Sequence, residues 1–272
     1  MREHKVISFV DNLKESYRKD RKTFIWYTIL RVLVFLTAIR CIFLKNWESL
    51  AMCILALAMF LLPALIQKLF KIKIPALFQI IIFCFIFAAE ILGEVDHFYV
   101  HIPGWDTMLH TMNGFLCAAV GFSLIDLLNR SSKKIQLSPF YLAFMAFCFS
   151  MTIGVLWEFF ECSVDLTLYN DMQKDFIVQD FGSVTLDPEN NGRSIHVMDI
   201  TETVIKTASG ETYTIEGGYL DIGILDTMKD LFVNFIGAVV MSIIGYVYEL
   251  KHNEKSIAKG LRLEVADEEH DL

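Results

Sequence analysis

The sequence lacks the short motifs by which many soluble enzymes are identified. It contains no phosphate-binding G-x-x-x-x-G-K-[ST] loop, no G-x-S-x-G nucleophile turn, no H-E-x-x-H zinc motif and no C-x-x-C pair among its six cysteines. Positive charge is also scarce, since 24 Lys and Arg residues stand against 32 Asp and Glu residues, a net charge of −8. The missing motifs argue against these enzyme classes, and the acidic balance argues against nucleic acid as a partner.

The sequence also shows no cleavable signal peptide. Its first apolar run begins near Thr23, behind a charged segment that is too long for the n-region of a signal peptide, and no A-x-A site follows. Residues 1–22 instead carry apolar side chains at helical spacing among Lys and Arg, namely Val6, Phe9, Val10, Leu13 and Tyr17. We therefore expect an amphipathic helix on the cytoplasmic membrane surface.

Apolar residues are what the chain has in excess. They make up 54% of the sequence, and the mean hydropathy is +0.46, whereas soluble domains contain about 45–50% apolar residues. The excess lies in blocks of roughly 20 residues, the length of helix that crosses about 30 Å of hydrocarbon. We predict an all-α polytopic membrane protein with about six transmembrane helices, at residues 23–44, 49–67, 74–97, 105–128, 139–162 and 226–249.

The short segments between these spans alternate in their content of Lys and Arg. Rich segments are 1–22, 68–73, 129–138 and the tail after 250, and poor segments are the turn near 46 and the stretch 98–104. Because cytoplasmic segments are enriched in Lys and Arg, both termini are expected in the cytoplasm.

Five parts follow from this topology. They are the cytoplasmic amphipathic segment 1–22, transmembrane helices 1–5 within 23–165, an extracytoplasmic insertion at 166–225, transmembrane helix 6 at 226–250, and a cytoplasmic tail at 251–272.

The insertion 166–225 is predicted to be small and β-rich. Two runs rich in β-branched residues, 203–207 and 212–215, flank a β-hairpin turn centred on Ser209 and Gly210. A second turn signal lies at 187–192. The insertion contains few large apolar residues, so we expect it to depend on the rest of the chain for stability.

Ionisable residues gather at one end of four spans, the outer end in the predicted orientation. Within each span they are three or four residues apart, which places each set on one helical face. The sets are Glu90, Glu94, His97 and His101; Asp106, His110 and Asn113; Glu158, Glu161 and Asp165; and Asp226, Asp230 and Asn234. Gly114, Gly237 and Ala238 should let neighbouring helices approach closely. We predict that the four faces form a polar pocket in the outer half of the membrane.

This pocket is a candidate site for a divalent metal ion. Carboxylates that share a site cannot all stay ionised without countercharge, and histidine among carboxylates suits Zn²⁺, Mn²⁺ or iron better than Ca²⁺. The candidate metal ligands are His110, Glu158, Glu161, Asp226 and Asp230. The candidate catalytic or ligand-binding set adds Asp106 and Asn234, and Glu90, Glu94 and His97 are secondary candidates. Asp106 and Asp226 have a structural explanation as well, because acidic residues stabilise helix N-termini.

Three motifs in this region resemble a known family. They are Trp105-Asp106-x3-His110-x3-Gly114, Gly154-x2-Trp157-Glu158-x2-Glu161 and Asp226-Thr-x2-Asp230-Leu-x2-Asn234-x2-Gly237-Ala238. Together they resemble the YjdF-type family of uncharacterised bacterial membrane proteins. The resemblance covers about residues 75–250 and implies a multispan protein of the bacterial plasma membrane.

The same motifs are more distantly similar to VanZ-like proteins, which share the order Asp-x3-His, Glu-x2-Gln and Asp-x3-Asn-x2-Gly. The matching positions are Asp106, His110, Glu158, Asp230, Asn234 and Gly237, whereas Glu161 replaces the neutral amide of that pattern. The VanZ-like resemblance implies an association with the cell envelope and glycopeptide-antibiotic tolerance.

Three functions remain open at this point. In the first, His110 and the acidic pairs bind a metal or act as acid and base on a lipid-linked envelope substrate, with Asn234 orienting the substrate. The second is a cation-coupled transporter, although Arg31 and Asp126 are the polar residues toward the cytoplasm and no inverted repeat is visible. The third is a non-catalytic scaffold whose insertion meets a partner.

Isolated polar residues in the spans carry expectations of their own. Arg31 lies deep in the first span and should need an acidic partner, whereas Arg40 lies close enough to its end to reach the interface. Trp105 and Trp157 suit the interfacial aromatic belt. The cysteines suit small buried apolar positions, and a disulfide between Cys41 and Cys162 is the alternative.

Overall fold

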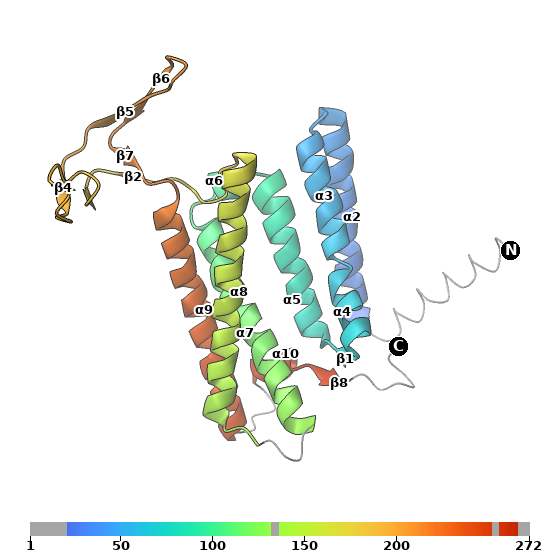
Figure 1. The fold of residues 1–272 in the computed structure, drawn as a ribbon. Coiled ribbons are helices and arrows are strands. Elements are labelled where there is room, and N and C mark those ends of the chain that lie inside the picture. Colours follow the sequence, from blue (N-terminus) through green and yellow to red (C-terminus); the bar gives the residue numbers. More distant parts are fainter. Residues whose placement is uncertain (1–20, 132–135, 252–255, 266–272) are drawn as a thin grey trace. The chain divides into compact units, whose positions relative to one another are not determined.

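The computed structural model describes residues 21–131, 136–251 and 256–265, so the predicted helix at 1–22 falls almost wholly outside the described residues. Six helical spans in the described part are long and apolar enough to cross a membrane (Figure 1): Arg21–Leu44, Trp47–Phe70, Ala76–Val95, Trp105–Ser131, Pro139–Leu168 and Ile224–Lys251. Each overlaps its predicted range. The protein is a polytopic, mainly α-helical membrane protein with a small β insertion.

The chain divides into two compact units. Unit 1 comprises Met1–Ile153 and Val233–Leu272, and unit 2 comprises Gly154–Phe232. Helices α8 (Pro139–Leu168) and α9 (Ile224–Lys251) are unbroken, so each has a part in both units.

The first half of unit 1 is a helical hairpin packed on a third helix. Helices α2 (Arg21–Leu44) and α3 (Trp47–Met59) lie side by side (Figure 1), and Asn46 between them caps α3 by accepting from Ser49 N. The span continues as α4 (Leu62–Phe70) after a break, because Pro63 in the first turn of α4 has no N–H to donate to the preceding turn. Their core is formed with the third span by Leu30, Val34, Phe60, Phe83 and Ile91.

The third span is not a regular α-helix. Helix α5 (Ala76–Ile86) passes into the π-helix η1 (Phe87–Val95), where Asp96 N donates to Ile91 O at 2.9 Å. His97 then adopts a left-handed conformation with φ of 57° and starts the short helix α6 (Phe98–His101).

The predicted helical face of Glu90 and Glu94 therefore does not continue to His97 and His101. Glu90 and Glu94 are about one turn apart on the π-helix, but the helix ends at Val95, before the first of the two histidines.

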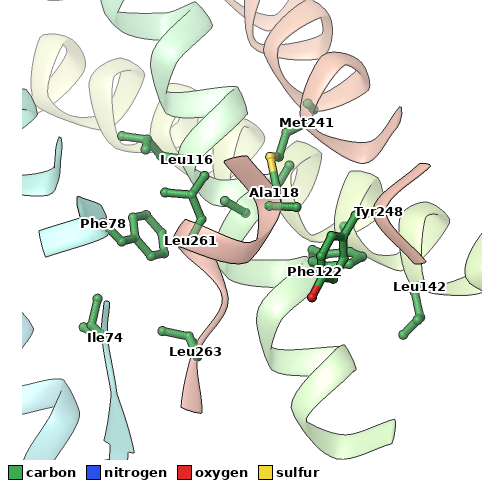
Figure 2. Close-up of a cluster of buried hydrophobic side chains, with 14 of the residues drawn as sticks. Ile74, Phe78, Leu116, Ala118, Phe122, Leu142, Met241, Tyr248, Leu261 and Leu263 are labelled. Atoms are coloured by element: carbon green, nitrogen blue, oxygen red, sulfur yellow. The ribbon is translucent and has the colours of Figure 1, made fainter. Parts of the chain in front are cut away.

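The second half of unit 1 is built around α7 (Trp105–Ser131). Gly104, with φ of 80°, makes the turn before it, and Asp106 in its first turn and Arg130 in its last turn complement the helix dipole. Figure 2 shows the apolar core here, to which α7, the unit 1 parts of α8 and α9, α5 and the C-terminal segment contribute side chains. The core includes Phe78, Leu116, Phe122, Leu142, Met241, Tyr248 and Leu261.

The insertion in unit 2 consists of three two-stranded antiparallel ladders. Strands β5 (Glu202–Lys206) and β6 (Thr212–Glu216) form the predicted hairpin, with Gly210 in its turn at φ of 90°. The other ladders pair β2 (Ile177–Val178) with β7 (Tyr219–Leu220) and β3 (Phe181–Ser183) with β4 (Ile195–Val197). Many apolar side chains of the insertion are exposed, among them Met198, Val204 and Tyr213.

The second predicted turn, at 187–192, is organised by one buried carboxylate. Asp187 accepts hydrogen bonds from the backbone N–H groups of Glu189, Asn191 and Arg193. This local network closes the turn without an apolar core.

Residues 256–265 pack against the helices of unit 1. Helix α10 (Ile257–Leu261) packs on α5 and α7, and β8 (Glu264–Val265) pairs with β1 (Ile72–Lys73), the short strand before α5. The sequence predicted a tail here and no packed segment.

Candidate functional site

The part of the candidate site that lies in unit 1 is at the start of α7. The Nε2 atom of His110 lies 3.3 Å from Oδ1 of Asp106, one helical turn earlier, and the His110 side chain is 11% exposed. The sequence predicted that these two residues share a face, and the structure brings them into contact.

One turn further along α7 the polar face continues into a helix crossing. Asn113 Nδ2 donates to Asn234 Oδ1 at 3.2 Å, and the amide nitrogen of Asn234 lies 3.7 Å from the Met151 sulfur. Asn234 is 1% exposed. It therefore ties α9 to both α7 and α8, a structural role that its position in the sequence motif did not predict.

Two glycines make this crossing possible, as the sequence predicted. A Cβ at Gly114 would lie 2.0 Å from the Asn234 carbonyl oxygen, and a Cβ at Gly237 would lie 2.0 Å from the Thr111 carbonyl oxygen. Ser150 on α8 donates to the Gly114 carbonyl at 2.7 Å. The three helices thus meet at a point with no space for larger side chains.

Unit 2 carries the acidic part of the candidate site. Four predicted site residues are buried there: Glu158 and Glu161 at 4% and 7% exposed on α8, and Asp226 and Asp230 at 3% and 1% on α9. Buried carboxylates are costly in a membrane protein unless they are paired, hydrogen-bonded or bound to a cation.

Lys229 supplies positive charge to the α9 pair. Its Nζ atom lies 2.7 Å from Asp226 Oδ1 and 3.5 Å from Asp230 Oδ1. Asp226 also accepts a hydrogen bond from the backbone N–H of Lys174 at 2.9 Å. Asp226 therefore has the structural role expected of an acid at a helix start, together with an ion pair.

On α8, Trp157 is hydrogen-bonded to one of the candidate site residues. Its Nε1–H donates to Glu161 Oε1 at 2.8 Å. Sequence reasoning placed Trp157 in the aromatic belt and outside the site. Its i,i+4 spacing to Glu161 was the signal that could have indicated the contact.

The loop after α8 connects the two helices within unit 2. Asp165 accepts from the N–H groups of Met172 and Gln173 at 2.7 and 2.8 Å, and the Gln173 side chain donates to Thr227 on α9. Asp165 thus fixes the loop that reaches the start of α9, a role that the sequence pattern alone did not show.

The secondary candidates lie around the end of the third span. Glu90 sits in the π-helix, and the rings of His97 and His101 meet edge to face with centroids 6.4 Å apart. The structure does not gather Glu90, Glu94 and His97 on one helical face.

The two arginines within the first span contact different kinds of partner. Arg40 forms a 2.5 Å ion pair with Asp96. Arg31 lies 5.1 Å from the centroid of the Tyr27 ring and, within the described residues, has this aromatic contact in place of the predicted acidic partner. All six cysteines are free thiols, so Cys41 and Cys162 form no disulfide.

Together these features define a class of protein: a multispan membrane protein with buried carboxylates on α8 and α9 and a histidine–aspartate pair on α7. The chain matches, over residues 23–251, the model of the family described as "Predicted membrane protein (DUF2238)", and it belongs to that family. No curated protein and no solved structure matches the chain.

Proposed function

We propose that this chain binds a divalent metal ion in the outer half of the membrane and uses the site to bind or act on a lipid-linked ligand of the cell envelope. The metal ligands are His110, Glu158, Glu161, Asp226 and Asp230. The observation that carries the proposal is the burial of these four carboxylates, each at most 7% exposed, within unit 2.

The charge balance supports a cation. Four ionised carboxylates carry four negative charges, and Lys229 is the lysine that forms ion pairs with two of them. A divalent ion together with Lys229 would bring three positive charges to the cluster. Without added charge, four buried carboxylates would repel one another, so the cluster needs a counterion.

The histidine has the arrangement of a metal ligand. In metal sites a ligating imidazole commonly contacts a carboxylate through its second nitrogen, and this contact fixes the orientation of the ring. The contact between Asp106 and His110 has this form. Asp106 is therefore proposed as a positioning residue rather than as a ligand.

Spacing along unbroken helices supports the proposal that these residues act together. His110 is one turn before Gly114 on α7, and Asp230 is one turn before Asn234 on α9. Glu158 is two turns beyond Ser150 on α8. Gly114, Asn234 and Ser150 meet at the helix crossing in unit 1.

The envelope ligand and the topology are parts of the same proposal. Alternation of Lys and Arg supports cytoplasmic termini and an extracytoplasmic segment 166–225. The resemblance to VanZ-like proteins supports a bacterial plasma membrane and an envelope role, with the site open to the outer leaflet.

Metal analysis of the purified protein tests the proposal. We expect about one Zn²⁺, Mn²⁺ or iron per chain in the unaltered protein, and loss of most of it in Glu158→Gln and Asp230→Asn, because each substitution removes an anionic ligand. The matched control is Asp171→Asn, which neutralises a 62% exposed carboxylate of the same unit and should keep the metal.

Absence of bound metal from the unaltered protein, or its retention in both variants, would overturn the metal proposal. The envelope role is tested separately by complementation in cells. Loss of an envelope phenotype in His110→Ala at normal membrane abundance supports it, whereas normal complementation contradicts it.

A further inference from the structure

We call the segment 256–265 the C-terminal latch. A few buried apolar side chains anchor it in unit 1. Ala258, Leu261 and Leu263 are 1%, 0% and 3% exposed, whereas Ile257 on the opposite face of α10 is 55% exposed. Figure 2 shows Leu261 among the core side chains, close to Phe78 of α5. The latch thus covers an apolar groove formed by α5, α7 and α9.

Backbone groups of the latch are bound by the groove as well. Ser123 of α7 donates to the Leu261 carbonyl at 3.0 Å, and Arg130 donates to the Leu263 carbonyl at 3.2 Å. The chain then adds β8 to β1 as a second strand. Side-chain pockets combined with strand addition are a common way in which a protein surface holds a short peptide.

The charged centre of the groove is Asp126, which is 1% exposed. Arg262 of the latch makes two hydrogen bonds to its carboxylate, at 2.5 and 2.9 Å, and a third to the Tyr248 hydroxyl at 3.0 Å. Arg130, one turn from Asp126 on α7, lies 2.9 Å from the same carboxylate. Asp126 would therefore keep one arginine partner if the latch were to leave.

We infer that the C-terminal latch is a reversible cover over this surface of unit 1, and that it leaves as a unit while the six spans stay folded. Short terminal segments held by few apolar contacts open at lower free energy than the core does. The retained Arg130 removes the penalty of a stranded buried charge. The inference does not depend on the metal site.

Thiol labelling of the full chain in detergent tests the inference. Ser123, 1% exposed beneath the latch, is replaced by Ser123→Cys, and its reaction with a hydrophilic maleimide is followed by peptide-resolved mass spectrometry. We expect slow labelling when the latch is intact. Adding Leu261→Asp should raise the rate on the order of tenfold or more, whereas the matched control Ile257→Asp should leave it unchanged.

Cys53, which is 0% exposed in the other core of unit 1, reports whether the fold survives. It should stay unlabelled in every variant. If Leu261→Asp exposes Cys53, the second variant, Arg262→Gln, decides the question and should speed labelling at position 123 alone. Equal rates in all variants, or no labelling at position 123 in any of them, would overturn the inference. Metal content should not change, which separates this test from that of the proposed function.

Discussion

Asp126 and Asp230 are both 1% exposed, yet their charges are compensated in different ways. Asp230 has Lys229 beside it in the sequence, whereas Asp126 is shared by Arg130 and by Arg262, which is 136 residues away. The pKa of Arg262 is raised by its hydrogen bond to Asp126, which keeps the guanidinium charged. Lys229 and Arg130 are close to their partners in the sequence, whereas only the tertiary structure brings Arg262 to Asp126.

A stability prediction follows from the two arginines of Asp126. Asp126→Ala leaves both arginines without their acceptor, and we expect the free energy of unfolding to fall by about 3–5 kcal/mol, as when one partner of a buried ion pair is removed. Arg262→Ala should cost less, because Arg130 still neutralises Asp126. Unfolding by denaturing detergent, followed by circular dichroism, measures both. A larger loss in Arg262→Ala than in Asp126→Ala would contradict this account.

The stability of the junction between the insertion and α9 is expected to depend on pH through Asp221. Partial burial raises the pKa of Asp221, but hydrogen bonds from the backbone N–H groups of Phe176, Leu225 and Gly223 outweigh burial and lower the pKa below its ordinary value. The stabilisation is therefore present above the ordinary aspartate pKa of about 3.9 and is lost as the pH falls through the lower value of the folded state.

Hydrogen exchange at the amides of Phe176 and Leu225 measures this effect. After correction for intrinsic rates, protection should fall below about pH 4 and should be low at all pH values in Asp221→Ala. The amide of Ile205 is a control, because Ile205 pairs with Tyr213 at a hydrogen-bonded position of the β5–β6 ladder, two residues before Thr207, whose N–H donates to Glu211 O. Protection of Phe176 and Leu225 that does not vary with pH would rule out the role of Asp221.

At the scale of elements, the helices of the candidate site are positioned by contact between backbones rather than by large side chains. Gly114 and Gly237 let α7 and α9 touch, and the Asn113–Asn234 hydrogen bond fixes how one helix is aligned with the other. Small residues and interhelical hydrogen bonds are the usual means of association in membranes, where lipid is as apolar as a leucine side chain.

Gly237→Ala should therefore disturb the crossing. Its methyl group would lie 2.0 Å from the Thr111 carbonyl oxygen, so the helices must separate, and we expect a loss of unfolding free energy on the order of 1–3 kcal/mol. Ile236→Ala, at a 42% exposed neighbouring position, is the control and should change stability less. The same detergent unfolding measurement applies, and equal stability of Gly237→Ala and the unaltered protein would refute the tight crossing.

The third span shows where periodicity fails at this scale. Its hydropathy correctly predicted a membrane span, but His97 does not continue the face of Glu90 and Glu94 because the helix ends at Val95. The order of apolar residues does not distinguish a π-helix from an α-helix, so the sequence predicted the span and not its change of geometry.

At the scale of the whole molecule, the sequence by itself determined the six spans, the hairpin at 202–216 and the distribution of acids along the helices. A membrane span depends on the hydropathy of about 20 consecutive residues, and a hairpin turn depends on a few adjacent residues. The spans and the hairpin can therefore be predicted without knowing the fold. For the same reason Asp106 could be paired with His110 from their spacing alone.

The tertiary structure alone decided the contacts between residues distant in sequence. It joined Arg262 to Asp126, Asn113 to Asn234 and β8 to β1, and it turned a predicted tail into a packed segment. Each of these contacts depends on which helix surfaces meet, and that depends on side-chain volume and on the satisfaction of buried polar groups across the whole bundle. No periodicity within a single span contains that information.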